Sequence, residues 1–147
     1  MKRSESLTTL SRDHHKALYQ AMRLRRAGED DLAEIRGEAL EFWSSHGALH
    51  FRIEEELLLP GFARHADPDQ EAVIRVLLDH VWLRQRFAAL GEGRLDLAAT
   101  RELGERLGRH VRHEERVLFP LIESALPDEE LAALGRAIAA AEAAGPG

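Results

Sequence analysis

The sequence predicts an all-α protein, an up-down-up-down antiparallel four-helix bundle with an additional short helix near its C-terminal end. Apolar residues recur at a spacing of about 3.6 residues through most of the chain, which is the period of an amphipathic helix. Ala, Leu, Glu and Arg are abundant and only 5% of residues are aromatic, a composition that favours helix. No run of alternating apolar and polar residues is bounded by turn residues, so strands are not expected.

The first predicted helix begins near Leu7, follows the 3.6-residue apolar period and stops at Gly28. Asp31 can cap a second and longer helix, which Pro60 ends or kinks. The segment 61–68 is then expected to connect the second helix to the third.

Asp69 is expected to open the third helix, which ends at the glycine turn 91–93. Its inward stripe is predicted to contain Val73, Val76, Leu77, Leu83, Phe87 and Leu90. The fourth helix is expected from about Asp96 to Pro120, and a short fifth helix over about 128–144. Four long amphipathic helices with short connections favour antiparallel neighbours.

The 147 residues suit one domain, with the bundle over about 7–122. A net charge of -6 gives no electrostatic reason to expect nucleic acid or an anionic membrane as a partner. The start lacks the apolar stretch of a secretory signal and no apolar run approaches the roughly 18 residues of a membrane span, so we expect a cytoplasmic protein. Without cysteine, any metal must be held by histidine and carboxylate.

One pattern occurs twice, 60 residues apart. Residues 50–60 read HFRIEEELLLP and residues 110–120 read HVRHEERVLFP, and both fit HxRxEExxLxP. Six identical positions suggest two copies of one helical-pair unit.

The HxxxE part of this pattern carries the chemistry. Residues four apart share a helix face, so His50 with Glu54, and His110 with Glu114, each place an imidazole beside a carboxylate. Each pair could chelate a metal. The glutamates that follow point about 100° further round and are expected to face solvent or to support the ligands from outside; they are Glu55 and Glu115.

The first and third helices carry matching single histidines, in Asp13-His14 and Asp79-His80. Both His14 and His80 lie in the middle of an apolar stripe, so we expect them to point inward. His15 is rotated off that stripe but remains open as the alternative to His14. The neighbouring aspartates could accept hydrogen bonds from the imidazoles of other helices.

In an antiparallel bundle these histidines fall at the same height. The resulting layer contains four imidazoles and two carboxylates, too many ligands for one tetrahedral zinc but suited to two metals bridged by Glu54 and Glu114. Nitrogen and oxygen ligands with open positions favour two iron ions, with manganese or zinc as substitutes. A lone inward histidine or one HxxxE pair is usually structural, but matched copies facing one another would be costly to bury without a metal.

These motifs resemble those of the hemerythrin-like, or HHE cation-binding, domains, over about 110 residues up to Pro120. The resemblance implies an up-down four-helix bundle with a non-haem, oxo- or hydroxo-bridged di-iron centre that reacts with dioxygen or nitric oxide. It also implies the ligands, which are His14, His50, Glu54, His80, His110 and Glu114.

The sequence departs from the oxygen carriers of that family, which use five histidines and two carboxylates. Here the third helix has one central histidine, and a fifth histidine ligand could come from His15 or from His46, one turn before His50. If neither binds, the metal pair has an additional open position. That favours reaction with oxygen, peroxide or nitric oxide over reversible oxygen carriage.

Function therefore has a leading hypothesis and two alternatives. The leading one is a di-iron protein that binds or senses dioxygen or nitric oxide, or handles iron, with an electron-transfer or signalling partner that the sequence does not identify. The alternatives are a redox enzyme that reduces peroxide or nitric oxide or oxidises ferrous iron, and a metal-free signalling bundle. Trp82 points away from the inward stripe, which makes a homodimer a further hypothesis.

Overall fold

The computed structural model describes residues 3–146. Every regular element within that range is a helix, so the all-α prediction is confirmed. The first helical stretch joins the 3-10 turn η1 (Glu5–Leu7) to α1 (Thr8–Arg25). The second is built from α2 (Leu32–Phe42), the π-helical turn η2 (Trp43–Gly47), α3 (Ala48–Ile53), a second π-helical turn η3 (Glu54–Leu58) and α4 (Leu59–Ala63).

The third stretch is the single helix α5 (Glu71–Gly91). The fourth joins α6 (Leu97–His113), the π-helical turn η4 (Glu114–Leu118) and α7 (Phe119–Ala125). The last helix is α8 (Asp128–Ala144). Among the described residues, no helix has the length and apolarity needed to cross a membrane.

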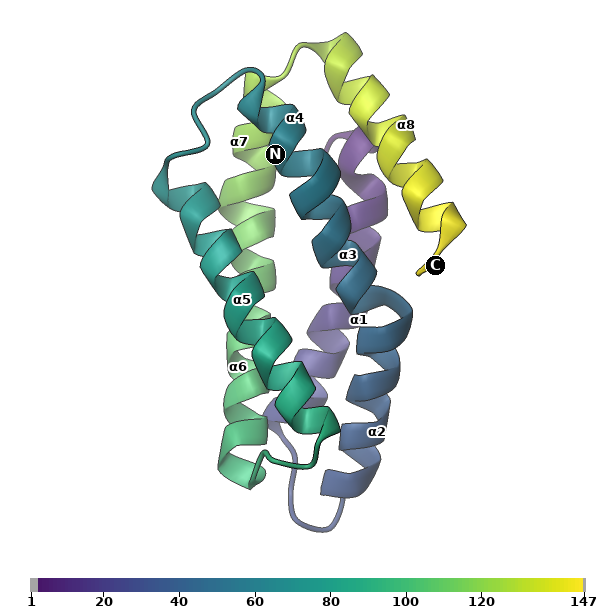
Figure 1. Cartoon of the computed structure of the whole chain (residues 1–147), viewed down its shortest axis with the longest axis vertical. Coiled ribbons are helices and arrows are strands. Elements are labelled where there is room, and N and C mark those ends of the chain that lie inside the picture. The colour runs from purple at the N-terminus through teal and green to yellow at the C-terminus, as the bar shows by residue number, and fades with distance from the viewer. Residues whose placement is uncertain (1–2, 147) are drawn as a thin grey trace.

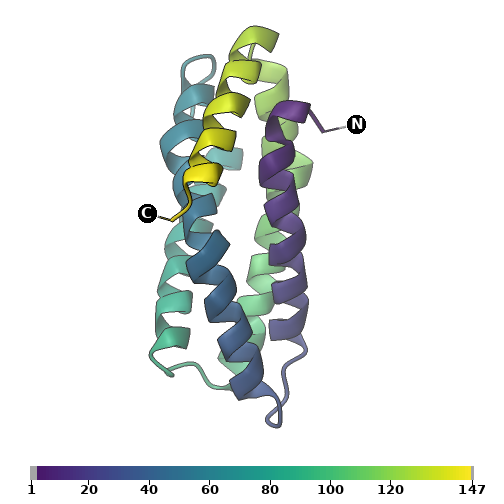
Figure 2. The same ribbon diagram turned by 90° about the vertical axis from the view of Figure 1, so that its right-hand side faces the viewer.

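Four long stretches lie side by side along the longest axis of the molecule (Figure 1). Helix α1 contacts α6 and α2, and α5 contacts the same two helices from the other side. Helix α8 lies outside these four, across the seam between the N-terminal stretch and the α3–α4 stretch, where it contacts η1, α3 and η3 (Figure 2). A fifth helix packed on a four-helix core therefore fits the expected architecture.

Both prolines of the repeat lie inside helical stretches, so the predicted helix end at Pro120 and the predicted start of the connection at residue 61 are wrong. The second stretch continues past Pro60 to Ala63, and the fourth continues past Pro120 to Ala125. Each proline follows a π-helical turn and occupies the first turn of the next α-helical segment. Proline is tolerated there because its missing N–H and its ring do not interrupt an established α-helical hydrogen-bond ladder.

Asp31 precedes α2, but its side chain does not cap that helix. Its carboxylate accepts a hydrogen bond from the Gly28 N–H at 2.8 Å, and so closes the turn between the first two stretches. Asp96 makes the capping contact at the start of α6, where it accepts from the Ala99 N–H at 2.8 Å.

The stripe predicted for the third helix is wrong at Leu77, whose side chain is 42% exposed. It belongs to an outer apolar row on α5, because residues three, four and seven apart share a helix face. The row contains Ile74, Leu77, Leu78 and Val81. Trp82 is only partly exposed and packs beneath the guanidinium groups of Arg86 and Arg106. The homodimer stays a prediction.

Two apolar clusters form the core, one toward each end of the bundle. One is built around Leu24, Phe87 and Leu103, and the other around Leu10, Phe62 and Phe119. Buried histidines and glutamates lie between them in the sequence of every long stretch, as His14 does between Leu10 and Ala17. The interior therefore has a polar layer that separates two apolar ones.

The closest approach of α1 to α6 is made at Gly104. A Cβ atom there would lie 2.5 Å from the Arg25 backbone nitrogen and 2.6 Å from the Ala21 carbonyl oxygen. Gly104→Ala should therefore destabilise the fold by about 1–3 kcal/mol, the usual cost of overpacking a core. Gly37→Ala is the matched control, because a Cβ at this α2 position meets nothing within 4 Å and should stabilise the helix by about 0.5–1 kcal/mol. Urea denaturation of both variants tests the pair, and equal shifts would contradict the close α1–α6 contact.

Candidate metal centre

The structure brings six of the predicted site residues together in one buried group, which we call the polar layer. Glu54 and Glu114 have no exposed surface, and the four imidazoles are each at most 5% exposed. His14 comes from α1, His80 from α5, and the other ligand candidates from the two repeat segments. The polar layer consists of His14, His50, Glu54, His80, His110 and Glu114.

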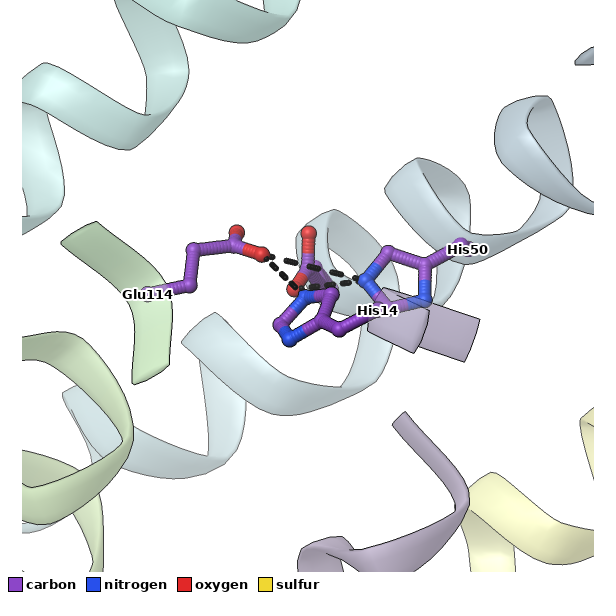
Figure 3. Close-up of side chains that lie close together, drawn as sticks. His14, His50 and Glu114 are labelled. Atoms are coloured by element: carbon purple, nitrogen blue, oxygen red, sulfur yellow. Dashed lines mark hydrogen bonds and ion pairs between the residues drawn. The ribbon is translucent and has the colours of Figure 1, made fainter. Parts of the chain in front are cut away.

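Each glutamate faces both halves of the polar layer. Glu114 directs Oε1 toward His14 Nε2 at 2.8 Å and His50 Nε2 at 3.8 Å, as the close-up shows (Figure 3). Its other oxygen, Oε2, lies 3.3 Å from His110 Nε2 and 3.8 Å from His80 Nε2.

Glu54 divides its two oxygens in the same way. Its Oε2 lies 3.1 Å from His50 Nε2, and its Oε1 lies 3.1 Å from His80 Nε2. Both carboxylates thus span the gap between a His14–His50 pair and a His80–His110 pair. The candidate ligand atoms accordingly fall into two overlapping groups of four that share Glu54 and Glu114.

A second carboxylate holds the outer nitrogen of every imidazole. His50 Nδ1 lies 3.1 Å from Asp13 Oδ2, and His110 Nδ1 lies 2.9 Å from Asp79 Oδ2. His14 and His80 make the corresponding contacts at 2.5 Å, with Glu115 and Glu55. When each Nδ1–H donates to its carboxylate, the Nε2 lone pair is directed into the polar layer, which is how metal-binding histidines are usually oriented.

The outer carboxylates include the second glutamate of each Glu-Glu pair in the repeat. Glu55 and Glu115 support the imidazoles, which is one of the two roles expected for them. Two further side chains, which the sequence motifs do not include, contact these glutamates. Arg84 Nη1 lies 2.9 Å from Glu55 Oε2, and Ser11 Oγ lies 2.8 Å from Glu115 Oε2. Arg84 could have been found from its position four residues after His80, on the same helix face.

The π-helical turns begin at the two inward glutamates. Both η3 and η4 start at the glutamate of an HxxxE pair and extend over the next four residues. A π-helical turn widens the helix locally and is found mostly at functional sites. At each turn the two consecutive glutamates contact the two nitrogens of one imidazole: Glu54 and Glu55 contact His80, and Glu114 and Glu115 contact His14.

Charges within the cluster shift its pKa values strongly. Burial alone would lower the pKa of His80, but the carboxylates of Glu114, Glu54 and Glu55 raise it to about 10. Burial likewise opposes the charged form of His110, whose pKa is raised to about 9 by Glu114 and Asp79. Burial would raise the pKa of Glu114, yet the surrounding imidazoles hold it well below its usual range. Without a metal, protonated imidazoles therefore balance the negative charge of the ionised carboxylates.

Hydrogen bonds do not satisfy the polar layer. Within the described residues, His80 Nε2, His110 Nε2, Glu54 Oε1 and Glu114 Oε2 are buried and have no hydrogen-bond partner. Such buried groups are rare because each one loses its hydration without compensation. All of them face the centre of the polar layer, and their separations of 3.1 to 3.8 Å match those of ligands around one ion at bonds of about 2.0–2.2 Å. The donor set therefore fits a metal.

The remaining histidines lie outside the polar layer. His15 is exposed at the surface of α1, so of the two adjacent candidates the structure brings only His14 into the cluster. His46 is partly exposed, and its Nε2 lies 3.4 Å from Lys16 Nζ. His113 contacts the Ala72 carbonyl oxygen, and exposed His65 contacts Glu130.

Comparison with known protein families agrees with this geometry. Residues 6–122 match the model of the hemerythrin HHE cation binding domain. The chain belongs to this family. No match was found among curated proteins or among solved structures. The hemerythrin HHE match covers the four long stretches and ends before α8, and it contains every residue of the polar layer.

The pKa shifts predict how the stability of this hemerythrin HHE domain depends on pH when no metal is bound. Histidines whose folded pKa lies above the ordinary 6.5 contribute stability that is complete below about pH 6.5 and is lost as the pH rises through the folded values. For His110 and His80 these values are about 9 and about 10. The thermal midpoint of the metal-free protein should therefore fall from about pH 7 to about pH 10. Calorimetry at a series of pH values tests this, and a midpoint that rises over the same range would contradict it.

Proposed function

We propose that this chain is a non-haem di-iron protein whose metal pair binds or senses dioxygen or nitric oxide. The observation that carries the proposal is that each buried glutamate directs one oxygen to each pair of imidazoles. Two-metal sites hold their ions about 3.5–4 Å apart, and di-iron helix bundles hold such pairs with inward glutamates and histidines. The proposal takes the four long stretches to alternate in direction, which brings both HxxxE pairs to the height of His14 and His80.

In this assignment His14 and His50 would hold one ion, and His80 and His110 would hold the other. Glu54 and Glu114 would be shared by the two ions. Nitrogen and carboxylate oxygen donors in this mixture suit iron, with manganese and zinc as substitutes. When bound, iron would supply open coordination positions and a change of oxidation state. The outer carboxylates, Asp13, Glu55, Asp79 and Glu115, keep the imidazoles in the tautomer that binds metal.

The test is ligand binding by the reconstituted protein. Metal-free protein is loaded with ferrous iron under anaerobic conditions, freed of excess iron and titrated with nitric oxide, and a second sample is titrated with dioxygen. A new visible spectrum that saturates as either gas is added would support the proposal. Two bound irons whose spectra neither gas changes would reduce the site to a structural metal centre.

The small number of imidazoles favours a second candidate function, which is redox turnover. The polar layer offers two imidazoles to each ion, and neither His15 nor His46 belongs to it. Fewer protein ligands leave more open positions for a reactant. Turnover of hydrogen peroxide by the iron-loaded protein, lost in His110→Ala, would favour this candidate, and absence of turnover with intact gas binding would favour the first.

A further inference from the structure

A small cavity borders one side of the polar layer. Its volume is about 10 Å³, about the space in which the centre of one water-sized sphere can move. His14, His50 and Glu114 line the cavity on the side of the polar layer, and Ala17 and Gly47 also line it. The exposed surface inside the cavity is almost entirely apolar, which suits an uncharged ligand of one or two heavy atoms.

The cavity exists where the internal repeat is broken by small residues. Ala17 follows His14 by three positions, and the residue three positions after His80 is Leu83. Gly47 precedes His50 by three positions, and the residue three positions before His110 is Leu107. Both leucines are at most 2% exposed. The repeat therefore places leucine at two positions of one half where the other half has alanine and glycine.

Gly47 also marks a local departure of the backbone from the repeat. It ends η2, whereas the corresponding part of α6 is α-helical throughout. A Cβ at position 47 would lie 2.7 Å from Trp43 Cε3 and 3.1 Å from Phe42 Cε2. The missing side chain thus lets two aromatic rings form the cavity wall.

A surface groove reaches the same wall from outside. It lies between α1 and the α2–η2 segment and has a volume of about 560 Å³. The groove and the cavity share two lining residues, Phe42 and His46. Phe42 is buried and His46 is partly exposed, so these side chains stand between solvent and the cavity.

We propose that Ala17 and Gly47 limit the size of the ligand that reaches the polar layer, and that ligands enter from this groove between Phe42 and His46. The inference rests on the proposed function, because it assigns the route to the proposed metal pair. Dioxygen and nitric oxide are small enough to reach the polar layer by this route, and larger organic molecules are not.

The first test uses metal-free protein. Trp43 lines the cavity, so its fluorescence reports whether a quencher reaches the cavity. The chain has two tryptophans, so Trp82→Phe leaves Trp43 as the only indole. In that background we expect dioxygen to quench Trp43 fluorescence far more effectively than acrylamide does. Ala17→Leu should lower the quenching constant for dioxygen, because the larger side chain fills the cavity that Trp43 lines. His46→Ala should raise the constant for acrylamide.

Ala33→Leu is the matched control, because it makes the same change at an exposed position of α2 and should leave both quenching constants unchanged. Ala17→Val is the milder variant if Ala17→Leu does not fold, and His46→Ala adds no bulk to the core. Unchanged dioxygen quenching in the folded Ala17 variant would overturn the size filter. Unchanged acrylamide quenching in His46→Ala would overturn the entrance.

Iron-loaded protein then separates this inference from the proposed function. Ala17→Leu should keep the iron content of the parent protein and slow the association of nitric oxide. Equal association rates in the parent and in Ala17→Leu would overturn the route. If the parent protein binds no iron, the proposed function fails, and the quenching experiment in metal-free protein still decides whether the cavity admits small gases through the groove.

Discussion

Glu114→Gln should produce a folded protein that no longer retains two metal ions. The substitution removes the charge of a fully buried carboxylate that faces all four imidazoles. Even loss of a group that only supports a ligand lowers metal affinity 10–100-fold, so we expect a loss of roughly 100-fold or more here. Removing one charged partner from a buried ionic cluster leaves the other charges uncompensated, so the substitution should also destabilise the metal-free protein by about 3–5 kcal/mol.

Metal analysis after loading and dialysis, with circular dichroism to verify folding, measures these effects. Glu56→Gln is the matched control, since this exposed glutamate pairs with Arg52 at 3.1 Å on the surface of the same stretch. Such surface pairs contribute about 0–1 kcal/mol, so the control should keep its metal and its stability. A folded Glu114→Gln protein that retains both ions would refute the bridging role.

The second large effect is a difference between adjacent histidines. His14→Ala should remove one of the two imidazoles proposed for one ion, so that this ion is lost or exchanges rapidly, while His15→Ala should bind metal as the parent does. The reason is geometric: His14 Nε2 lies 2.8 Å from Glu114 Oε1, and His15 is exposed.

Calorimetric titration of both variants with ferrous iron under anaerobic conditions is the direct measurement. We expect His14→Ala to show one binding step where the parent shows two, and His15→Ala to reproduce the parent. Two binding steps in both variants, as in the parent, would mean that neither residue is a ligand, and loss of a step in His15→Ala alone would reverse the assignment.

The repeated HxxxE pairs and the two matched aspartate–histidine pairs were enough to predict the polar layer from the sequence. Residues four apart on a helix must share a face, so the relation of His110 to Glu114 follows from spacing alone. The choice between His14 and His15 does not, because adjacent residues differ by about 100° and apolar residues stand at helical spacing from both. Only the packing of α1 against its neighbours decides which imidazole is buried.

Other features left weaker signals in the sequence. A π-helical turn changes the hydrogen-bond register without a characteristic amino-acid composition, so the sequence does not reveal η3 and η4. For the same reason it predicts that Pro60 ends or kinks its helix, and the continuation to Ala63 is not foreseen. The contact between Asp79 and His110 joins different helices, and adjacency in sequence could suggest it but not establish it. The sequence predicts Leu77 in the inward stripe of α5 because the neighbouring helix face is also apolar, although the side chains on that face are exposed.

The central claim is a pair of ions held between two imidazole pairs and two shared carboxylates. Mössbauer spectroscopy of protein loaded with ⁵⁷Fe, combined with elemental analysis, tests it most directly. We expect two irons per chain that are magnetically coupled after oxidation, and loss of that coupling in Glu114→Gln. One uncoupled iron per chain, or a single tetrahedral zinc that iron does not displace, would contradict it.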